Sequence, residues 1–157
     1  MPRLSHNNPA VLLSSVKVLL KNIDYIKDAV LRQGVIKKLA APLISLLACE
    51  AELQYVALRN ISFILQKQPT IFENNVKVFY CKFNDPVYVK MEKVDILIKV
   101  VDKTNCDQIL NELKEYSSDN DTEIVGIAVK AIGQIVLKIE SSVKTAASCI
   151  HDIVKNG

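Results

Sequence analysis

Apolar residues recur along the chain at steps of three and four positions, the spacing of one face of an α-helix. Leu13, Val16, Leu20 and Ile23 show this spacing first. Seven further sets follow within residues 36–46, 53–64, 72–83, 87–101, 109–116, 124–135 and 143–154. We therefore predict an all-α fold of about eight antiparallel helices, each three to four turns long.

Residues that begin or interrupt helices support this reading. Asp85 precedes Pro86, which predicts an N-cap followed by proline at the first helical position. Thr104 and Asp107 have the spacing of a capping box, with Asp in place of the usual Glu. Pro42 lies inside an apolar set, and we expect it to kink that helix.

The apolar sets repeat with the period of a helix pair. Shifts of 33, 37 and 45 residues bring one set onto another, and the shift of 33 aligns Ile61 with Val94 and Leu65 with Ile98. Such a period is typical of HEAT and armadillo solenoids, in which each pair packs on its neighbours. We predict that residues 1–157 form one segment of an α-α superhelix, excerpted from a longer trunk. Residues 1–8 are expected to be a disordered tail and residues 22–33 a loose loop.

Composition and charge narrow the class of protein. Half of the residues are hydrophobic and 24% are charged, which excludes a disordered chain or a disulfide scaffold. The net charge of +3 is uneven: residues 1–48 carry seven Lys and Arg against two acidic residues, whereas residues 85–157 carry nine Lys against twelve acidic residues. A basic end favours an acidic partner or a lipid surface. No dense basic stripe with interleaved aromatics predicts nucleic-acid binding.

The sequence offers little catalytic or metal chemistry. It has no Gly-rich phosphate loop, nucleophile elbow or HExxH motif, so we predict no catalytic residue, no cofactor and no enzyme activity. Glu92 and Asp95 lie one helical turn apart, and nearby lysines predict surface ion pairs for them. The histidines and cysteines are too dispersed for a metal site, and the thiols are expected to be buried: His6, His151, Cys49, Cys81, Cys106 and Cys149.

Two tetrapeptides match the Tyr-x-x-apolar form of a sorting signal. They run from Tyr55 to Leu58 and from Tyr88 to Met91. Such signals are read as extended peptides, whereas both tetrapeptides fall within predicted helices. We therefore interpret their side chains as core packing.

Several blocks of sequence closely resemble beta-adaptin, the beta subunit of clathrin-associated adaptor protein complexes. The blocks keep the family's order and spacing from about residue 10 to 155, and the stretch 22–33 and Gly126 depart from them. They comprise residues 54–61, 66–69, 77–79, 82–90, 92–96, 112–116, 130–133 and 138–140.

The resemblance implies a structural role in a heterotetramer with a second large adaptin, a medium chain and a small chain. The segment would belong to the middle-to-late N-terminal trunk and would scaffold the medium and small chains. Clathrin would be bound by parts of the parent chain outside this segment. The implied location is cytoplasmic and peripheral, on trans-Golgi, endosomal or plasma-membrane coated vesicles and pits, and the implied process is cargo sorting and endocytosis. The family's known binding sites match no motif here, so no individual binding residue is assigned.

Two other readings stay open on the periodicity alone. One is a different solenoid binder, such as another vesicle-coat subunit or a nuclear transport receptor. The other is a helical regulatory segment of an enzyme, such as a kinase or phosphatase scaffold. Neither readily gives blocks 54–61 and 82–90 together.

Overall fold

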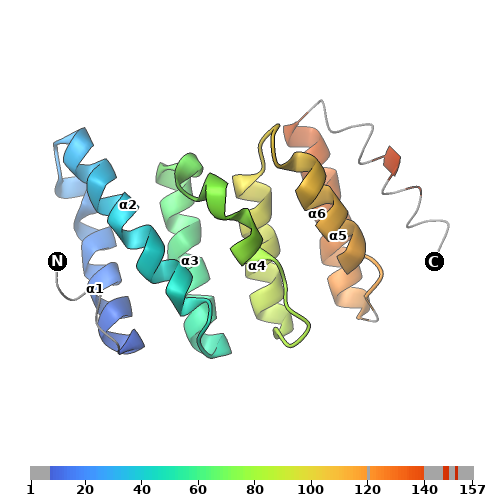
Figure 1. The fold of residues 1–157 in the computed structure, drawn as a ribbon, viewed down its shortest axis with the longest axis horizontal. Helices are drawn as coiled ribbons and strands as arrows, with labels where there is room; N and C mark the ends of the chain where they lie inside the picture. The colour runs from blue at the N-terminus through green and yellow to red at the C-terminus, as the bar shows by residue number, and fades with distance from the viewer. Residues whose placement is uncertain (1–7, 120, 140–146, 149–150, 152–157) are drawn as a thin grey trace. The chain divides into compact units, whose positions relative to one another are not determined.

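Every regular element in the described part of the chain is a helix. The computed structural model describes residues 8–119, 121–139, 147, 148 and 151, and it contains six α-helices and two 3₁₀ segments there (Figure 1). Their contacts divide the chain into two compact units, one up to Asn74 and one from Asn75. The predicted all-α class is therefore confirmed.

The first unit contains three α-helices that alternate in direction (Figure 1). They are α1 (Pro9–Asn22), α2 (Ala29–Leu46) and α3 (Ala51–Lys67), with the 3₁₀ segment η2 (Ile23–Tyr25) after α1. Helix α2 packs against α3, and α1 contacts both. The fully buried side chains of this unit are those that the apolar spacing selected, including Val16, Ile23, Leu39, Leu43, Ala57, Leu58, Ile61 and Ile64.

Side-chain caps fix where the first two helices begin. Asn8 Oδ1 accepts a hydrogen bond from Ala10 N at 2.9 Å, and Pro9 takes the first helical position. Asp28 Oδ1 accepts from Val30 N at 2.9 Å. The loose loop expected over residues 22–33 is therefore wrong in its second half, because the Asp28 cap starts α2 five residues earlier than the apolar set indicated.

The second unit contains α4 (Val87–Val100), α5 (Cys106–Tyr116) and α6 (Thr122–Lys138), and α6 packs against both of the others. The 3₁₀ segment η3 (Pro69–Phe79) includes the point that divides the units, and its backbone leaves helical geometry at Asn75. The buried apolar side chains of this unit include Phe79, Val89, Ile96, Leu97, Ile109, Leu110, Leu113, Ile132 and Ile135.

The helix count differs from the expected eight for two reasons. Residues 72–83 form part of η3 and a loop instead of an α-helix, so Phe72 and Phe79 are buried whereas Phe83 is 95% exposed. The kink at Asn75 breaks the helical register before Phe83 can reach the core. The last predicted set, at 143–154, falls mostly outside the described residues, as does the tail predicted over 1–7.

Two predicted helix caps are placed differently in the structure. Pro86, rather than Asp85, is the N-cap of α4, and the Asp85 carboxylate accepts from Lys82 N instead. The capping box of Thr104 and Asp107 is also wrong. Thr104 instead donates to Asp102 through its N–H and its hydroxyl, at 2.7 and 2.6 Å. These bonds, led by the hydroxyl bond, lower the pKa of Asp102 below its ordinary value.

The end of α6 is tied to the end of α4. Lys138 Nζ donates to the carbonyl oxygens of Ile98 and Lys99, both at 2.9 Å. These carbonyls lie in the last turn of α4, where a cation interacts favourably with the helix dipole. Partial burial nevertheless lowers the pKa of the Lys138 ammonium, and Asp102 opposes that shift. Among the described helices, none is both long and apolar enough to cross a membrane.

Candidate functional site

The residues that could serve catalysis or metal binding do not converge. Cys106 is buried, Cys49 and Cys81 are half-buried, and His151 is exposed, so the expectation of buried thiols holds fully only for Cys106. Within the described ranges, no three His, Cys, Asp or Glu side chains are arranged to hold a metal ion. His6 and Cys149 lie outside those ranges. The surface hollows of each unit are therefore the places to look for binding.

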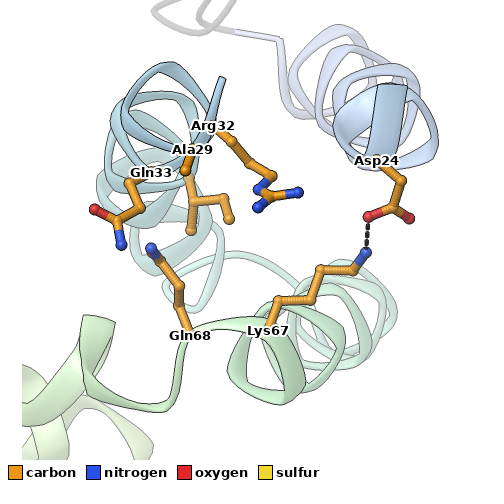
Figure 2. Close-up of a pocket in the computed structure, with 7 residues that line it drawn as sticks. Asp24, Ala29, Arg32, Gln33, Lys67 and Gln68 are labelled. Atoms are coloured by element: carbon orange, nitrogen blue, oxygen red, sulfur yellow. Dashed lines mark hydrogen bonds and ion pairs between the residues drawn. The ribbon is translucent and has the colours of Figure 1, made fainter. Parts of the chain in front are cut away.

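The first unit has a hollow of about 300 Å³ between the start of α2 and the end of α3. We call it the α2–α3 hollow. Figure 2 shows the Arg32 side chain extending from α2 toward Asp24 and Lys67 on the opposite side. Its lining residues come from η2, α2 and the end of α3: Asp24, Ala29, Arg32, Gln33, Ile36, Lys67 and Gln68.

The charges in the α2–α3 hollow are only partly paired. The Lys67 ammonium forms an ion pair with the Asp24 carboxylate (Figure 2), and it also lies 5.1 Å from the centre of the Phe63 ring. In the part of the chain that the structure describes, no acceptor is bound to the half-buried Arg32 guanidinium. The hollow therefore presents one uncompensated positive charge.

The second unit has a smaller groove of about 170 Å³ between α4 and α6. Its floor is mainly apolar, and both acidic and basic side chains stand at its edge. It is lined by Met91, Glu92, Val94, Asp95, Ile98, Ile127, Lys130, Ala131 and Gln134. Glu92 and Asp95, the carboxylate pair found in the sequence, thus lie at a groove shared by two helices.

The surface ion pairs predicted around Glu92 and Asp95 are wrong for two of the lysines. Lys93 is only 1% exposed, and its Nζ lies 2.5 Å from Asp85 Oδ2. Lys90 Nζ lies 3.5 Å from Asp119 Oδ2. Both partners are distant along the sequence, which is why spacing within one helix could not identify them.

The buried Lys93–Asp85 pair anchors the loop that precedes α4. Asp85 Oδ2 also accepts from Lys82 N at 2.7 Å, and Lys93 Nζ is 3.4 Å from the carbonyl oxygen of Tyr80. The carboxylate and the ammonium therefore each have a second partner, as buried charges require. The conspicuous sequence block 82–90 is thus explained by structure: its Asp holds the loop closed over α4.

A second polar chain fastens the same loop to α5. Tyr116 donates its hydroxyl hydrogen to Glu112 Oε1 at 2.7 Å, and its oxygen accepts from Cys81 N at 2.7 Å. Burial is the main cause that raises the pKa of Tyr116 well above its ordinary range. Burial likewise raises the pKa of the Cys81 thiol to about 11, which keeps it protonated and unreactive at neutral pH.

The two tyrosine tetrapeptides lie in α3 and α4, as predicted. Their interpretation as core packing is right for Leu58, which is fully buried, and wrong for Tyr55, Tyr88 and Met91, which are exposed. Because the four residues are helical, they are not presented as an extended peptide.

The sequence reasoning assigned no binding residue and missed the lining of both hollows. The one available signal was that residues 22–33 depart from the beta-adaptin blocks, because four of the seven α2–α3 hollow residues come from this stretch. Lys67 and Gln68 reach it only through the packing of α3 on α2.

Comparison with known proteins gives the family. The model of the adaptin N terminal region matches residues 1–157. The chain is 49% identical over 155 residues to the mouse AP-1 complex subunit beta-1, covering 98% of this chain and 16% of the relative. It is 44% identical to the AP-1 complex subunit beta of Dictyostelium discoideum and to the AP-2 complex subunit beta of Schizosaccharomyces pombe, covering 16% and 22% of them.

These matches confirm the resemblance that the sequence blocks indicated. They run along nearly the whole chain, and the relatives named above are all beta subunits. The chain spans less than a quarter of the length of each of these relatives. It belongs to the adaptin N terminal region family, a helical solenoid family, and within it to the beta-adaptins.

Proposed function

We propose that this chain is a non-catalytic scaffold segment of a beta-adaptin. Its partners would be a second large adaptin, a medium chain and a small chain, and the assembly would serve coated-vesicle formation and cargo sorting. The observation that carries the proposal is the 49% identity to a protein named as a subunit of the AP-1 complex, sustained over 98% of the chain.

The physical basis of such a scaffold is surface burial between preformed helical faces. Each unit encloses an apolar core and still leaves large apolar side chains exposed, among them Tyr25, Val30, Tyr88 and Leu137. Each unit also carries a hollow lined by charged and apolar groups together. Protein interfaces combine apolar contact with a polar rim in this way, and binding there needs no chemical step.

The proposed location follows from the proposed assembly. The chain would be cytoplasmic and would reach trans-Golgi, endosomal or plasma membranes only as part of the complex. Clathrin binding is assigned to regions of the parent protein outside this segment. The relatives include subunits of both AP-1 and AP-2 complexes, so the proposal extends to either membrane system.

The test is affinity purification of the full-length parent from its own cells, followed by quantitative mass spectrometry. The proposal predicts a second large adaptin, a medium chain and a small chain in amounts equal to the parent. The identity of the medium chain would also show which membrane system the complex serves. Nuclear pore proteins, or a kinase or phosphatase, recovered without adaptin subunits would overturn the proposal in favour of another solenoid binder.

A further inference from the structure

The α2–α3 hollow holds a cation that lacks a counter-ion in the described structure. Arg32 projects into it from the first turns of α2, half-buried and facing the side on which Asp24 and Lys67 pair with each other (Figure 2). A guanidinium presents two parallel N–H donors that match a carboxylate or phosphate group. A partly desolvated guanidinium also gains more from such a partner than an exposed one.

The charge balance of the hollow selects between those two anions. Lys67 and Asp24 cancel, which leaves the single positive charge of Arg32. A second carboxylate, Asp28, caps the start of α2 and adds negative charge nearby. A phosphomonoester carries about −1.5 to −2 charges at neutral pH and would leave an excess beside two carboxylates. One carboxylate matches the hollow without excess.

The size of the hollow and its polar lining also suit a single side chain. A volume of about 300 Å³ lies at the lower limit of ligand pockets. The amides of Gln33 and Gln68 stand at its edge, between Arg32 and the end of α3 (Figure 2). Such amides can bond the second lone pairs of a bound carboxylate or the backbone that carries it.

The residues flanking the hollow in sequence favour a protein partner over a free anion. Tyr25, Val30 and Leu31 are 82%, 79% and 58% exposed, and they alternate along the chain with the lining residues Asp24, Ala29 and Arg32. A central charged pair bordered by aromatic and aliphatic side chains is a common composition of protein interfaces.

We propose that the α2–α3 hollow receives an Asp or Glu side chain of a protein partner, with Arg32 as its bidentate donor. The partner segment carries apolar residues beside the acidic one, which contact Tyr25, Val30 and Leu31. The inference rests on the proposed function in that the partner is another subunit of the same assembly. Residues 22–33 depart from the beta-adaptin blocks, so the contact is a property of this chain.

The chemistry is tested by nuclear magnetic resonance on the 157-residue chain. The side-chain Nε–Hε signal of Arg32 is followed while N-acetyl-glutamate α-amide, or inorganic phosphate at the same ionic strength, is added at pH 7. We expect saturable shifts with the glutamate derivative, with a dissociation constant on the order of 1–10 mM for so small a ligand. Arg32→Gln should weaken binding about tenfold or more, read from the Gln68 amide signal.

The matched control is Lys38→Gln, which removes the same charge from an exposed position of α2 outside the hollow. It should leave the glutamate titration within about twofold of the parent chain, because exposed charges are screened. Equal weakening by both variants would show a general charge effect and overturn the proposal. Tighter binding of phosphate than of the glutamate derivative would overturn the assignment of a carboxylate.

The protein partner is tested in the assembled parent with a photo-crosslinking amino acid in place of Gln33. We expect crosslinked peptides with an Asp or Glu within about two residues of the linked site. Peptides from a protein outside the adaptor assembly would support the hollow while contradicting the proposed function. Intact assembly with crosslinks only to lipid, to non-acidic peptides or to nothing would overturn the hollow and leave the proposed function standing.

Discussion

Replacing Lys93 by Met should be among the most damaging single changes in the second unit. The substitution keeps most of the aliphatic stem, so the packing volume is nearly unchanged, and it removes the ammonium group 2.5 Å from Asp85 Oδ2. Asp85 then keeps only the N–H of Lys82, at 2.7 Å, as its recorded partner. A buried carboxylate is left without its counter-ion.

The magnitude follows from burial. Lys93 and Asp85 side chains are 1% and 4% exposed, so water cannot replace the lost partner. Breaking a buried ion pair at one end typically costs about 3–5 kcal/mol, and the remaining N–H bond places this case near 3 kcal/mol. A cost of that size is a large fraction of the stability of a single domain, typically about 5–15 kcal/mol.

Urea unfolding followed by far-ultraviolet circular dichroism measures the effect. With an m-value of about 2 kcal/mol/M, a loss of about 3 kcal/mol lowers the unfolding midpoint by about 1.5 M. The control is Lys90→Met in the same helix, which removes a looser pair with Asp119 at 3.5 Å. Pairs of this kind contribute about 0–1 kcal/mol, so the control should shift the midpoint by less than about 0.5 M.

A double variant separates the unpaired charge from lost packing. Adding Asp85→Asn to Lys93→Met removes the stranded charge while an amide oxygen can still accept from Lys82 N. We expect the double variant to be more stable than Lys93→Met alone by about 1 kcal/mol or more. The reasoning is refuted if Lys93→Met costs less than about 1 kcal/mol, or if the second substitution makes the protein still less stable.

Three further predictions concern the second unit. Because the pKa of Cys81 rises from about 9 to about 11, its thiolate fraction at pH 8 should fall about 100-fold, and iodoacetamide should label it that much more slowly than in the urea-unfolded chain; equal rates would contradict the burial argument. Lys138→Met should cost about 1 kcal/mol in urea unfolding through its lost bonds to the end of α4, whereas Lys130→Met on the same helix should cost less than about 0.5, and equal costs would disprove the tie. Because the folded-state pKa of Asp102 is lowered, its stabilising effect should be present above the ordinary value near 3.8 and vanish as pH falls through the lower folded value; Asp102→Asn should flatten stability against pH below about 4, and an unchanged profile would contradict this.

The apolar spacing predicted the α-helices well because it records burial directly. Val16, Leu39, Ile61 and Ile135 were chosen by spacing alone, and all are buried to within a few per cent. The same information failed at Phe83, whose place in the pattern depends on a continuous helix. The departure of Asn75 from helical geometry depends on the surrounding tertiary structure, which spacing does not contain.

The polar interactions were predicted poorly because they join distant parts of the chain. Local spacing suggested that Asp85 caps α4 and that Lys93 is a surface lysine, yet the two bury each other. Lys67 and Asp24 are 43 positions apart and meet only when α3 packs beside η2. A sequence without aligned relatives gives no signal for such pairs, and the binding hollow that they border was therefore missed.

The central claim is that this segment itself contacts other subunits of an adaptor assembly. Lysine crosslinking and mass spectrometry of the purified parent complex test it most directly, because the exposed lysines Lys37, Lys38, Lys77 and Lys130 cover both units. The account predicts crosslinks from these lysines to the medium chain, the small chain or the second large adaptin. Crosslinks from them only within the parent chain, in a complex shown to be intact, would contradict it.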